Sequence, residues 1–264
     1  MKKTYVIILL FATSIILPNC SVKIEERNNI MYEKGSDKLF SGTREEYYDN
    51  GVIALKSVYE NGMMNGEATF YHKNGKKKSE GVTKNNNNEG LWKYWDSSGK
   101  KTFEINYVGG LENGVFQEFH PNKTIAVKCT KKDGEIDGIY ISYDENGNIS
   151  MDMLYEKGLP NGKVTNYYKN GNKKNEFYYF NGLKNGKINI YYEDGKLKSL
   201  GYYKDDKLDG NMTTYHKNGE IIGESFHENG KREGIWKFYN FNGKLIEERI
   251  YNDSVLIKTI NFKE

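Results

Sequence analysis

Four histidines and a set of acidic side chains are the residues with which this chain could do chemistry. His72, His120 and His216 are 48 and 96 residues apart, and His227 follows separately. Six acidic residues share a spacing that is a multiple of 24 residues: Glu80, Glu104, Asp152, Glu176, Glu224 and Glu248. Metal sites and acid–base pairs need their groups close together in space. Whether these residues meet depends on what the interval of 24 residues means for the fold.

The same interval marks a sequence repeat. Nine glycines, called marker glycines below, stand 24 residues apart: Gly42, Gly66, Gly90, Gly114, Gly138, Gly162, Gly186, Gly210 and Gly234. A fixed period of this size indicates one supersecondary unit that is copied and stacked, so that each unit buries its apolar side chains against its neighbours. Function is therefore expected on an extended surface.

Each repeat has the pattern of a β-hairpin. A second glycine follows the marker glycine by nine positions in eight units, with Lys123 in the remaining one, and Asn or Asp precedes most of these glycines, as in Asn50-Gly51. Such pairs tolerate the positive φ angles of a two-residue type I′ turn. The pattern predicts hairpins joined by short loops, because strands of about six residues fit and no helical period follows the leader.

The predicted fold is all-β, an elongated single-layer twisted antiparallel sheet of nine stacked β-hairpin repeats. Its length would be on the order of 85 Å, at roughly 10 Å per hairpin. Residues 42–257 form the repeats, residues 20–41 a tether and N-terminal cap, and residues 258–264 a C-terminal capping strand. Turn glycines are missing at Asn86, Lys123, Asp206 and Ser254, so the sequence does not determine the loop geometry there.

This architecture keeps the chemically capable residues apart. His72, His120 and His216 occupy one repeat position and would lie roughly 20 and 40 Å from one another. The six acidic residues would form a widely spaced, solvated row. The chain also has neither a phosphate-binding glycine motif before a helix nor a zinc-type cysteine pattern. We therefore expect no enzyme, no metal, no cofactor and no small-molecule substrate.

Strand parity predicts which residues form the core. Residues two positions after the marker glycine, such as Trp92, Val164 and Ile188, point to the opposite face from residues five positions after it. We assign the first set, together with the tyrosines at position seventeen, to the buried face. The aromatic residues at position five then line the other face, unless a bulge turns them back.

That aromatic row is the candidate binding site of the sequence. Its members are Tyr71, Trp95, Phe119, Tyr143, Tyr167, Tyr191, Tyr215 and Tyr239, with Tyr47 in the first unit. Rings at intervals of about 10 Å could hold an extended glycan or peptide. Packing also requires an aromatic residue in every unit, so a structural role for the row competes with ligand binding.

The N-terminus has the pattern of an export signal. Lys2 and Lys3 precede an apolar stretch from Tyr5 to Leu17 that has the length of a signal-peptide core. It ends at Leu17-Pro18-Asn19-Cys20 and resembles a bacterial lipoprotein signal, which implies removal of residues 1–19 and lipid attachment at Cys20. Asn19 departs from the small residue that is usual there, and simple secretion or an uncleaved anchor are the alternatives. Cys129, the other cysteine, is expected to be a small buried residue.

Net charge argues against one class of partner. The formal net charge is +3, and loss of Lys2 and Lys3 with the leader leaves +1, so no strong field exists to attract nucleic acid.

One repeat unit resembles a MORN repeat variant. It is the segment Gly162-Lys163-Val164-Thr165-Asn166-Tyr167-Tyr168-Lys169-Asn170-Gly171. Bacterial proteins of this make-up are often called YwqK-type antitoxin-like, and the resemblance implies repeats that mediate protein or membrane contacts.

The resulting functional prediction is a non-enzymatic lipoprotein of the bacterial cell envelope, in the outer membrane where the cell has one. Its membrane contact would be the lipid anchor, and its sheet surface would bind a protein or an envelope glycan. An antitoxin or immunity protein that masks a toxin is the alternative, and an envelope glycan-binding module is a third. A cytoplasmic antitoxin needs no export signal, so the leader argues against that version.

Overall fold

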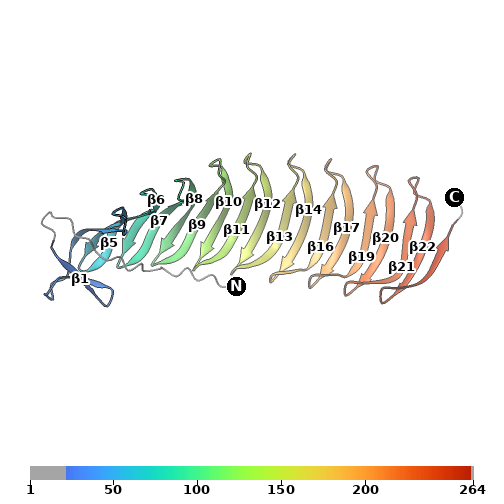
Figure 1. Cartoon of the computed structure of the whole chain (residues 1–264). Helices are drawn as coiled ribbons and strands as arrows, with labels where there is room; N and C mark the ends of the chain where they lie inside the picture. Colours follow the sequence, from blue (N-terminus) through green and yellow to red (C-terminus); the bar gives the residue numbers. More distant parts are fainter. Residues whose placement is uncertain (1–21, 263–264) are drawn as a thin grey trace. The chain divides into compact units, whose positions relative to one another are not determined.

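The computed structural model describes residues 22–262, which fall into two compact units, residues 22–123 and 124–262. The described residues contain strands and turns and no helix. In each unit the repeat strands form one antiparallel layer in which neighbours in the sequence are paired, and Figure 1 shows this order. The predicted fold class, an all-β open twisted sheet of hairpin repeats, is confirmed.

Unit 1 begins with a separate two-stranded hairpin and continues with seven repeat strands. The hairpin strands are β1 (Ile24–Arg27) and β2 (Ile30–Glu33). The repeat strands are β3 (Gly42–Tyr47), β4 (Ile53–Glu60), β5 (Met63–Tyr71), β6 (Lys77–Lys84), β7 (Asn87–Trp95), β8 (Lys101–Val108) and β9 (Leu111–Phe119).

Unit 2 continues the same alternation of strands. They are β10 (Ile125–Lys132), β11 (Glu135–Tyr143), β12 (Ile149–Glu156), β13 (Leu159–Tyr167), β14 (Lys173–Phe180), β15 (Leu183–Lys184), β16 (Gly186–Tyr191), β17 (Leu197–Lys204), β18 (Lys207–Leu208), β19 (Gly210–Tyr215), β20 (Ile221–Glu228), β21 (Lys231–Tyr239), β22 (Leu245–Asn252) and β23 (Val255–Asn261). Both β15 and β16 pair with β14, and both β18 and β19 pair with β17, so each couple is one interrupted strand.

The turns that join one repeat to the next are two-residue hairpin turns. Asn61 and Gly62 have φ angles of 50° and 78°, and Asn181 and Gly182 have 48° and 84°. Two successive positive φ angles define a type I′ turn, whose twist matches that of the flanking strands. The short loops predicted between hairpins are therefore hairpin turns themselves.

The predicted type I′ turn at the Asn-Gly pair inside each repeat is wrong. At Asn50-Gly51 only the glycine has a positive φ, 79°. The amide of Gly51 donates to the carbonyl of Tyr48 at 2.9 Å, and the amide of Tyr48 donates to the carbonyl of Val52 at 2.8 Å. The loop is thus a type I turn closed by a left-handed glycine, and the strand register shifts beside it, between Glu46 and Tyr47.

Side chains at these turns tie successive repeats together. The hydroxyl of Tyr168 donates to the carbonyl of Tyr191 at 2.8 Å, and that of Tyr192 donates to the carbonyl of Tyr215 at 2.7 Å. The amide nitrogen of Asn170 donates to the carbonyl of Glu193 at 2.8 Å. Each bond spans 23 residues, nearly one period, so the turns of successive repeats are hydrogen-bonded to one another as the strands are.

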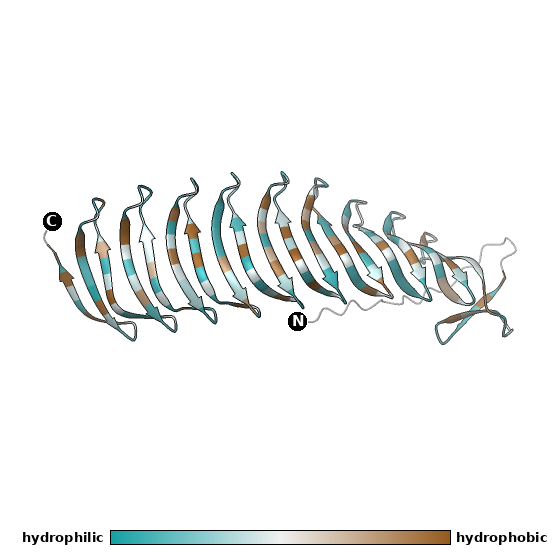
Figure 2. Cartoon of the chain, turned by 180° about the vertical axis from the view of Figure 1, so that it is seen from behind, coloured by the Kyte–Doolittle hydropathy of each residue, from teal (hydrophilic) through white to brown (hydrophobic). Residues whose placement is uncertain are grey.

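The buried face is the one that parity predicts. Ala68, Trp92, Val164 and Ile188, all two positions after a marker glycine, are 1–4% exposed. Their cross-strand partners share the face, and Ile105, which pairs with Trp92, is fully buried. Tyr59 and Tyr251, at position seventeen, are 7% and 5% exposed. Figure 2 shows hydrophobic and hydrophilic residues alternating along the strands, as a one-sided core requires.

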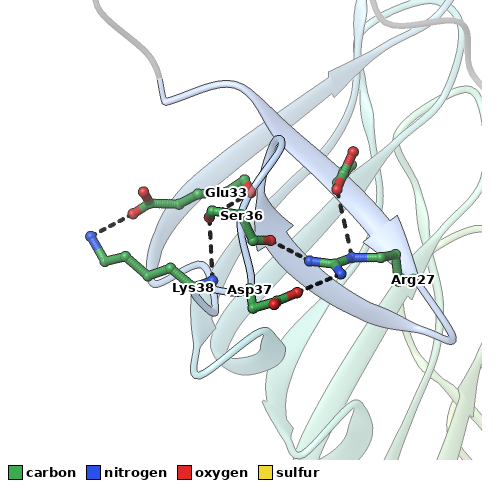
Figure 3. A network of polar contacts seen from close by, with 6 residues as sticks. Arg27, Glu33, Ser36, Asp37 and Lys38 are labelled. Atoms are coloured by element: carbon green, nitrogen blue, oxygen red, sulfur yellow. Dashed lines mark hydrogen bonds and ion pairs between the residues drawn. The ribbon is translucent and has the colours of Figure 1, made fainter.

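A small apolar cluster and a polar network hold the N-terminal hairpin in unit 1. Met31 and Phe40 pack with Tyr59, and the amide of Met31 donates to the carbonyl of Gly62 at 2.8 Å. In the hairpin Arg27 donates to Oδ1 of Asp37 at 2.9 Å and to the carbonyl of Ser36, as Figure 3 shows. The same figure shows the ion pair of Lys38 with Glu33, 2.7 Å long. This hairpin covers the apolar side chains of the first repeat.

The last strand, β23, pairs in a different register from the other repeats. Glu248 pairs with Ile260, whereas the equivalent Glu224 pairs with Lys237, three positions after a marker glycine. Lys258 stands where the next marker glycine would fall. The register shift lies between Ile250 and Tyr251 here, whereas in the preceding repeat it lies between Glu224 and Phe226. A slip of one residue reverses the faces, which puts Ile260 on the face of Glu248.

Candidate functional site

The predicted binding row lies on the face opposite to the buried one, called the outer face below. Each aromatic residue at position five is half-buried, and three of the tyrosines donate hydrogen bonds to a carboxylate of the preceding repeat. Tyr167 donates to Asp152 at 2.6 Å, Tyr191 to Glu176 at 2.6 Å and Tyr239 to Glu224 at 2.7 Å. Their hydroxyls are thus engaged within the sheet, which gives this part of the row a structural role.

Glu176 is the centre of the densest polar cluster on the outer face. Its Oε1 lies 2.5 Å from Nζ of Lys163 and 2.7 Å from Nζ of Lys173. Its Oε2 accepts from Tyr191 at 2.6 Å and from Asn189 at 3.3 Å. Burial raises the pKa of this carboxyl, but the two lysines, the phenol and the amide together lower it to about 2. The expectation of a solvated acidic row fails here, because Glu176 is only 5% exposed.

The phenols that face these carboxylates stay protonated. Burial, followed by the hydrogen bond to the carboxylate, raises the pKa of Tyr167, Tyr191 and Tyr239 to about 12. A phenol with such a pKa is a permanent donor at neutral pH and a poor general acid or base. The tyrosine–carboxylate pairs therefore fasten one repeat to the next.

The histidines have separate structural environments. Nε2 of His72 lies 2.9 Å from the carbonyl oxygen of Trp95, and the His216 ring packs on Phe241 with centroids 5.2 Å apart. His227 is buried against Trp236, 5.1 Å away, and its Nδ1 has no hydrogen-bond partner. Over residues 22–262, no three His, Cys, Asp or Glu side chains are grouped in a way that could hold a metal ion.

A second row on the outer face, sixteen positions after each marker glycine, was missed by the sequence analysis. In unit 2 it contains Leu154, Tyr178, Tyr202 and Phe226, which are 46%, 41%, 45% and 39% exposed. A Cβ on Gly162, Gly186 or Gly210 would lie within 4 Å of the side chain of Leu154, Tyr178 or Tyr202, respectively. These are ordinary van der Waals distances, so the large side chains stand directly beside the marker glycines of the next repeat, whose positive φ angles of 102–106° favour glycine.

Polar residues are the cross-strand partners of the three aromatic members of this row, whereas Leu154 pairs with Ile139. Lys163 is the cross-strand partner of Tyr178, Lys187 that of Tyr202 and Asn211 that of Phe226. We call the seven residues Leu154, Lys163, Tyr178, Lys187, Tyr202, Asn211 and Phe226 the outer stripe. Parity could have found it, since position sixteen must face away from the buried position seventeen. That the stripe is exposed follows only from the packing.

Only one of the two cysteines, Cys129, lies within the described residues. Cys20, the predicted lipid attachment site, lies outside the described residues. Cys129 is 3% exposed on β10, in agreement with the expected buried role. No helix within residues 22–262 is long and apolar enough to cross a membrane.

The repeat signature decides the family. The model of the MORN repeat variant matches seven segments that together cover more than half of the chain: residues 40–61, 64–85, 88–108, 136–157, 184–205, 208–229 and 232–253. The chain belongs to the MORN repeat variant family. The matched segments begin two residues before a marker glycine, and six of the seven end at the first residue of the type I′ turn, whereas 88–108 ends one residue before it. The repeats at Gly114 and Gly162 fall outside the matched segments.

Solved structures offer distant likenesses. A mutant of TarM from S. aureus, in complex with Fondaparinux, alpha-GlcNAc-glycerol and UDP, matches 41% of this chain and 19% of its own at 16% identity and a TM-score of 0.25. The TcdB2-TccC3-Cdc42 structure matches 84% of this chain and 13% of its own at 11% identity and a TM-score of 0.19. A porin-like protein from Bacteroides uniformis matches 78% and 87% at 10% identity and a TM-score of 0.19. No curated protein matched the chain.

Proposed function

We propose that this MORN repeat protein is a non-enzymatic lipoprotein of the cell envelope that binds a partner with the outer face of its sheet. The observation that carries the proposal is the outer stripe, with four large apolar side chains 39–46% exposed in successive repeats. Exposed apolar stripes of this kind mark interaction sites in soluble proteins.

The chemistry of the two faces supports a binding role over catalysis. Side chains of neighbouring repeats fill the buried face, where Trp92 and Ile105 are at most 2% exposed. Glu176, whose carboxyl has a pKa lowered to about 2, is ionised and accepts hydrogen bonds at both oxygens. This state suits a structural ion pair, because a general acid must carry a proton at the working pH. A flat, repeated surface suits an extended partner better than a small substrate.

The location in the envelope rests on the leader. Its two lysines, short apolar core and Cys20 have the order of an export signal with an acylation site. Two or more acyl chains on one cysteine would hold the protein stably at a membrane surface.

Two experiments test the parts of this proposal. Metabolic labelling with a clickable fatty acid and cell fractionation should show label and membrane retention for the wild type and neither for Cys20→Ala. An unlabelled, cytoplasmic wild type would contradict the location and favour the intracellular antitoxin alternative.

The second experiment addresses the binding face. A photo-crosslinking amino acid at Tyr202 should trap a partner in cells, whereas the same group at Lys169, in the exposed hairpin turn at the other end of the strands, should not. Equal crosslinking at both positions, or at neither, would remove the outer stripe from the proposal.

A further inference from the structure

We propose that the outer stripe of unit 2 binds a linear acidic glycan, with sugar rings on Tyr178, Tyr202 and Phe226 and the anionic groups of the glycan on the neighbouring lysines. This inference rests on the proposed binding function of the outer face and names the chemistry of its partner.

The aromatic residues of the stripe provide a periodic stacking platform. Tyr178, Tyr202 and Phe226 each occupy position sixteen of successive repeats, two strands apart, which sets them at about 10 Å intervals. Their side chains are 41%, 45% and 39% exposed, so one surface of each is accessible. An aromatic ring packs well against a flat, partly apolar ring of similar size, and a pyranose ring has such a face. A polymer of sugars can therefore repeat its contact from one hairpin to the next.

Lysines stand between and beside these rings. Lys187 is the cross-strand partner of Tyr202. It directly follows Gly186, where an added Cβ would lie 3.6 Å from the Cβ of Tyr178, so Lys187 lies between the two rings. Lys204 and Lys207 are directly opposite each other across the turn that follows Tyr202. All three lysines are exposed, and within residues 22–262 none of them forms an ion pair with a carboxylate. Two like charges in a cross-strand pair destabilise a sheet, and a bound anion would relieve this repulsion.

The acidic residues near these lysines are already engaged in the fold. Asp206 accepts the amide of Lys184 at 2.8 Å, and Asp205 accepts the side-chain amide of Asn185 at 3.0 Å. Asp209 accepts the amide of Asn229 at 3.0 Å. Glu176 is held by Lys163 and Lys173. Within the described residues none of these carboxylates forms an ion pair with Lys187, Lys204 or Lys207, so the three ammonium groups remain available to the anionic groups of a ligand.

The shape of the site selects a chain over a compact ligand. The stripe is a succession of protruding side chains on one sheet face, and the repeats of Tyr178, Tyr202 and Phe226 each offer one aromatic side chain and one polar partner. A single sugar would contact one ring, and such a contact is weak. A chain that spans three repeats adds three contacts in one binding event, because binding the first unit holds the next ones near their sites.

The test uses the full chain, purified in detergent if it carries lipid, and oligomers of polygalacturonate as the acidic glycan. Titration calorimetry should show binding that weakens as the salt concentration rises, since exposed charges are screened. Tyr202→Ala and Lys187→Gln should each weaken binding about tenfold, which corresponds to one lost ring or charge contact. Phe241→Ala and Lys169→Gln are the matched controls, since both residues are exposed in hairpin turns away from the stripe, and both should bind as the wild type does.

Dextran, a neutral glycan, and an oligothymidylate, a polyanion of another class, separate the alternatives. Weak or absent binding of both supports the acidic glycan. Equal binding of dextran would show that the lysines are not recognised, and equal binding of the oligothymidylate with no effect of Tyr202→Ala would reduce the site to charge alone; either result overturns the inference. If the glycan does not bind but the crosslinker at Tyr202 traps a protein in cells, the inference fails and the binding function of the outer face stands. If neither occurs, both fail.

Discussion

The hydroxyl of Tyr191 donates a hydrogen bond of 2.6 Å to Oε2 of Glu176, a residue of the preceding repeat. The two residues are fifteen positions apart, and the same relation joins Tyr167 to Asp152 and Tyr239 to Glu224. In these three repeats the recurring aromatic residue thus connects hairpins as well as covering the sheet. Because the acceptors are ionised carboxylates, these pairs make the stability of the fold sensitive to pH.

Replacing Glu176 should destabilise unit 2. Glu176→Gln removes the charge that Lys163 and Lys173 face, and leaves these cations without their partner. For a buried, charge-assisted cluster we expect a loss of about 1 to 3 kcal/mol in the free energy of unfolding. The equivalent Glu80→Gln should cost less, because the side chain of Glu80 is 30% exposed and pairs with Lys77 alone. Urea unfolding at pH 7 measures both, and equal losses would contradict a special role for Glu176.

The same carboxyl should give the fold an acid limit. Its pKa is about 2 in the folded protein, below the value of 4.5 for a free glutamate, so its ionised form stabilises the fold. This contribution is fully present above about pH 4.5 and is lost as the pH falls toward 2. The difference in urea unfolding midpoint between the wild type and Glu176→Gln should therefore shrink as the pH falls from about 5 to about 2.5. A constant difference would show that Glu176 acts by shape alone.

His227 should add a second pH dependence in a higher range. Burial, and then the charge of Arg232, lower the pKa of His227 below 6.5, so the folded protein favours the neutral ring. The stability that this provides is present above about pH 6.5 and is lost as the pH falls. His227→Tyr, which restores the residue that six other repeats have at this position, should make the melting temperature less sensitive to pH between about 7 and 5. An unchanged pH profile in this variant would contradict the assignment.

Two glycines at one repeat position should respond differently to a methyl group. A Cβ on Gly81 would lie 2.4 Å from the ring of Trp92, whereas a Cβ on Gly201 would lie 3.4 Å from Ile188 and Met212. Gly81→Ala should therefore destabilise unit 1 by about 1 to 3 kcal/mol through overpacking. Gly201→Ala should cost clearly less. Thermal melts compare the two variants, and a loss in Gly201→Ala as large as in Gly81→Ala would show that this contact distance does not control the cost.

Introducing glycine at two positions where the turn glycine is missing should change the stability of the protein differently. Lys123 and Asp206 have φ angles of 74° and 65°, which favour glycine. Oδ1 of Asp206 accepts the amide of Lys184 at 2.8 Å, so its side chain compensates for the backbone cost. We expect Lys123→Gly to stabilise the protein by about 1 kcal/mol, because the strain of a non-glycine residue disappears. Asp206→Gly should give no gain, and a gain of similar size in both would show that the hydrogen bond contributes nothing.

Several features of the fold follow from local sequence. The period, the strands, the buried face and the left-handed glycines were predictable, because side chains alternate along a strand and only a few residues tolerate a positive φ. Trp92, Val164 and Ile188 are buried as that alternation requires. The sequence also predicted a separate place for each histidine, and His72, His216 and His227 indeed have different neighbours.

The details that bear on function were decided by tertiary structure. The glycine of Asn50-Gly51 closes a type I turn, because the register of the whole hairpin determines which turn fits. Glu176 is buried although equivalent carboxyls are more exposed, since Lys163, Lys173 and Tyr191 happen to converge on it. Tyr202 is exposed whereas Tyr191 is half-buried and bonded, although both are outer-face tyrosines. Local sequence determines the face on which a side chain lies, but its exposure depends on contacts with residues about one repeat away.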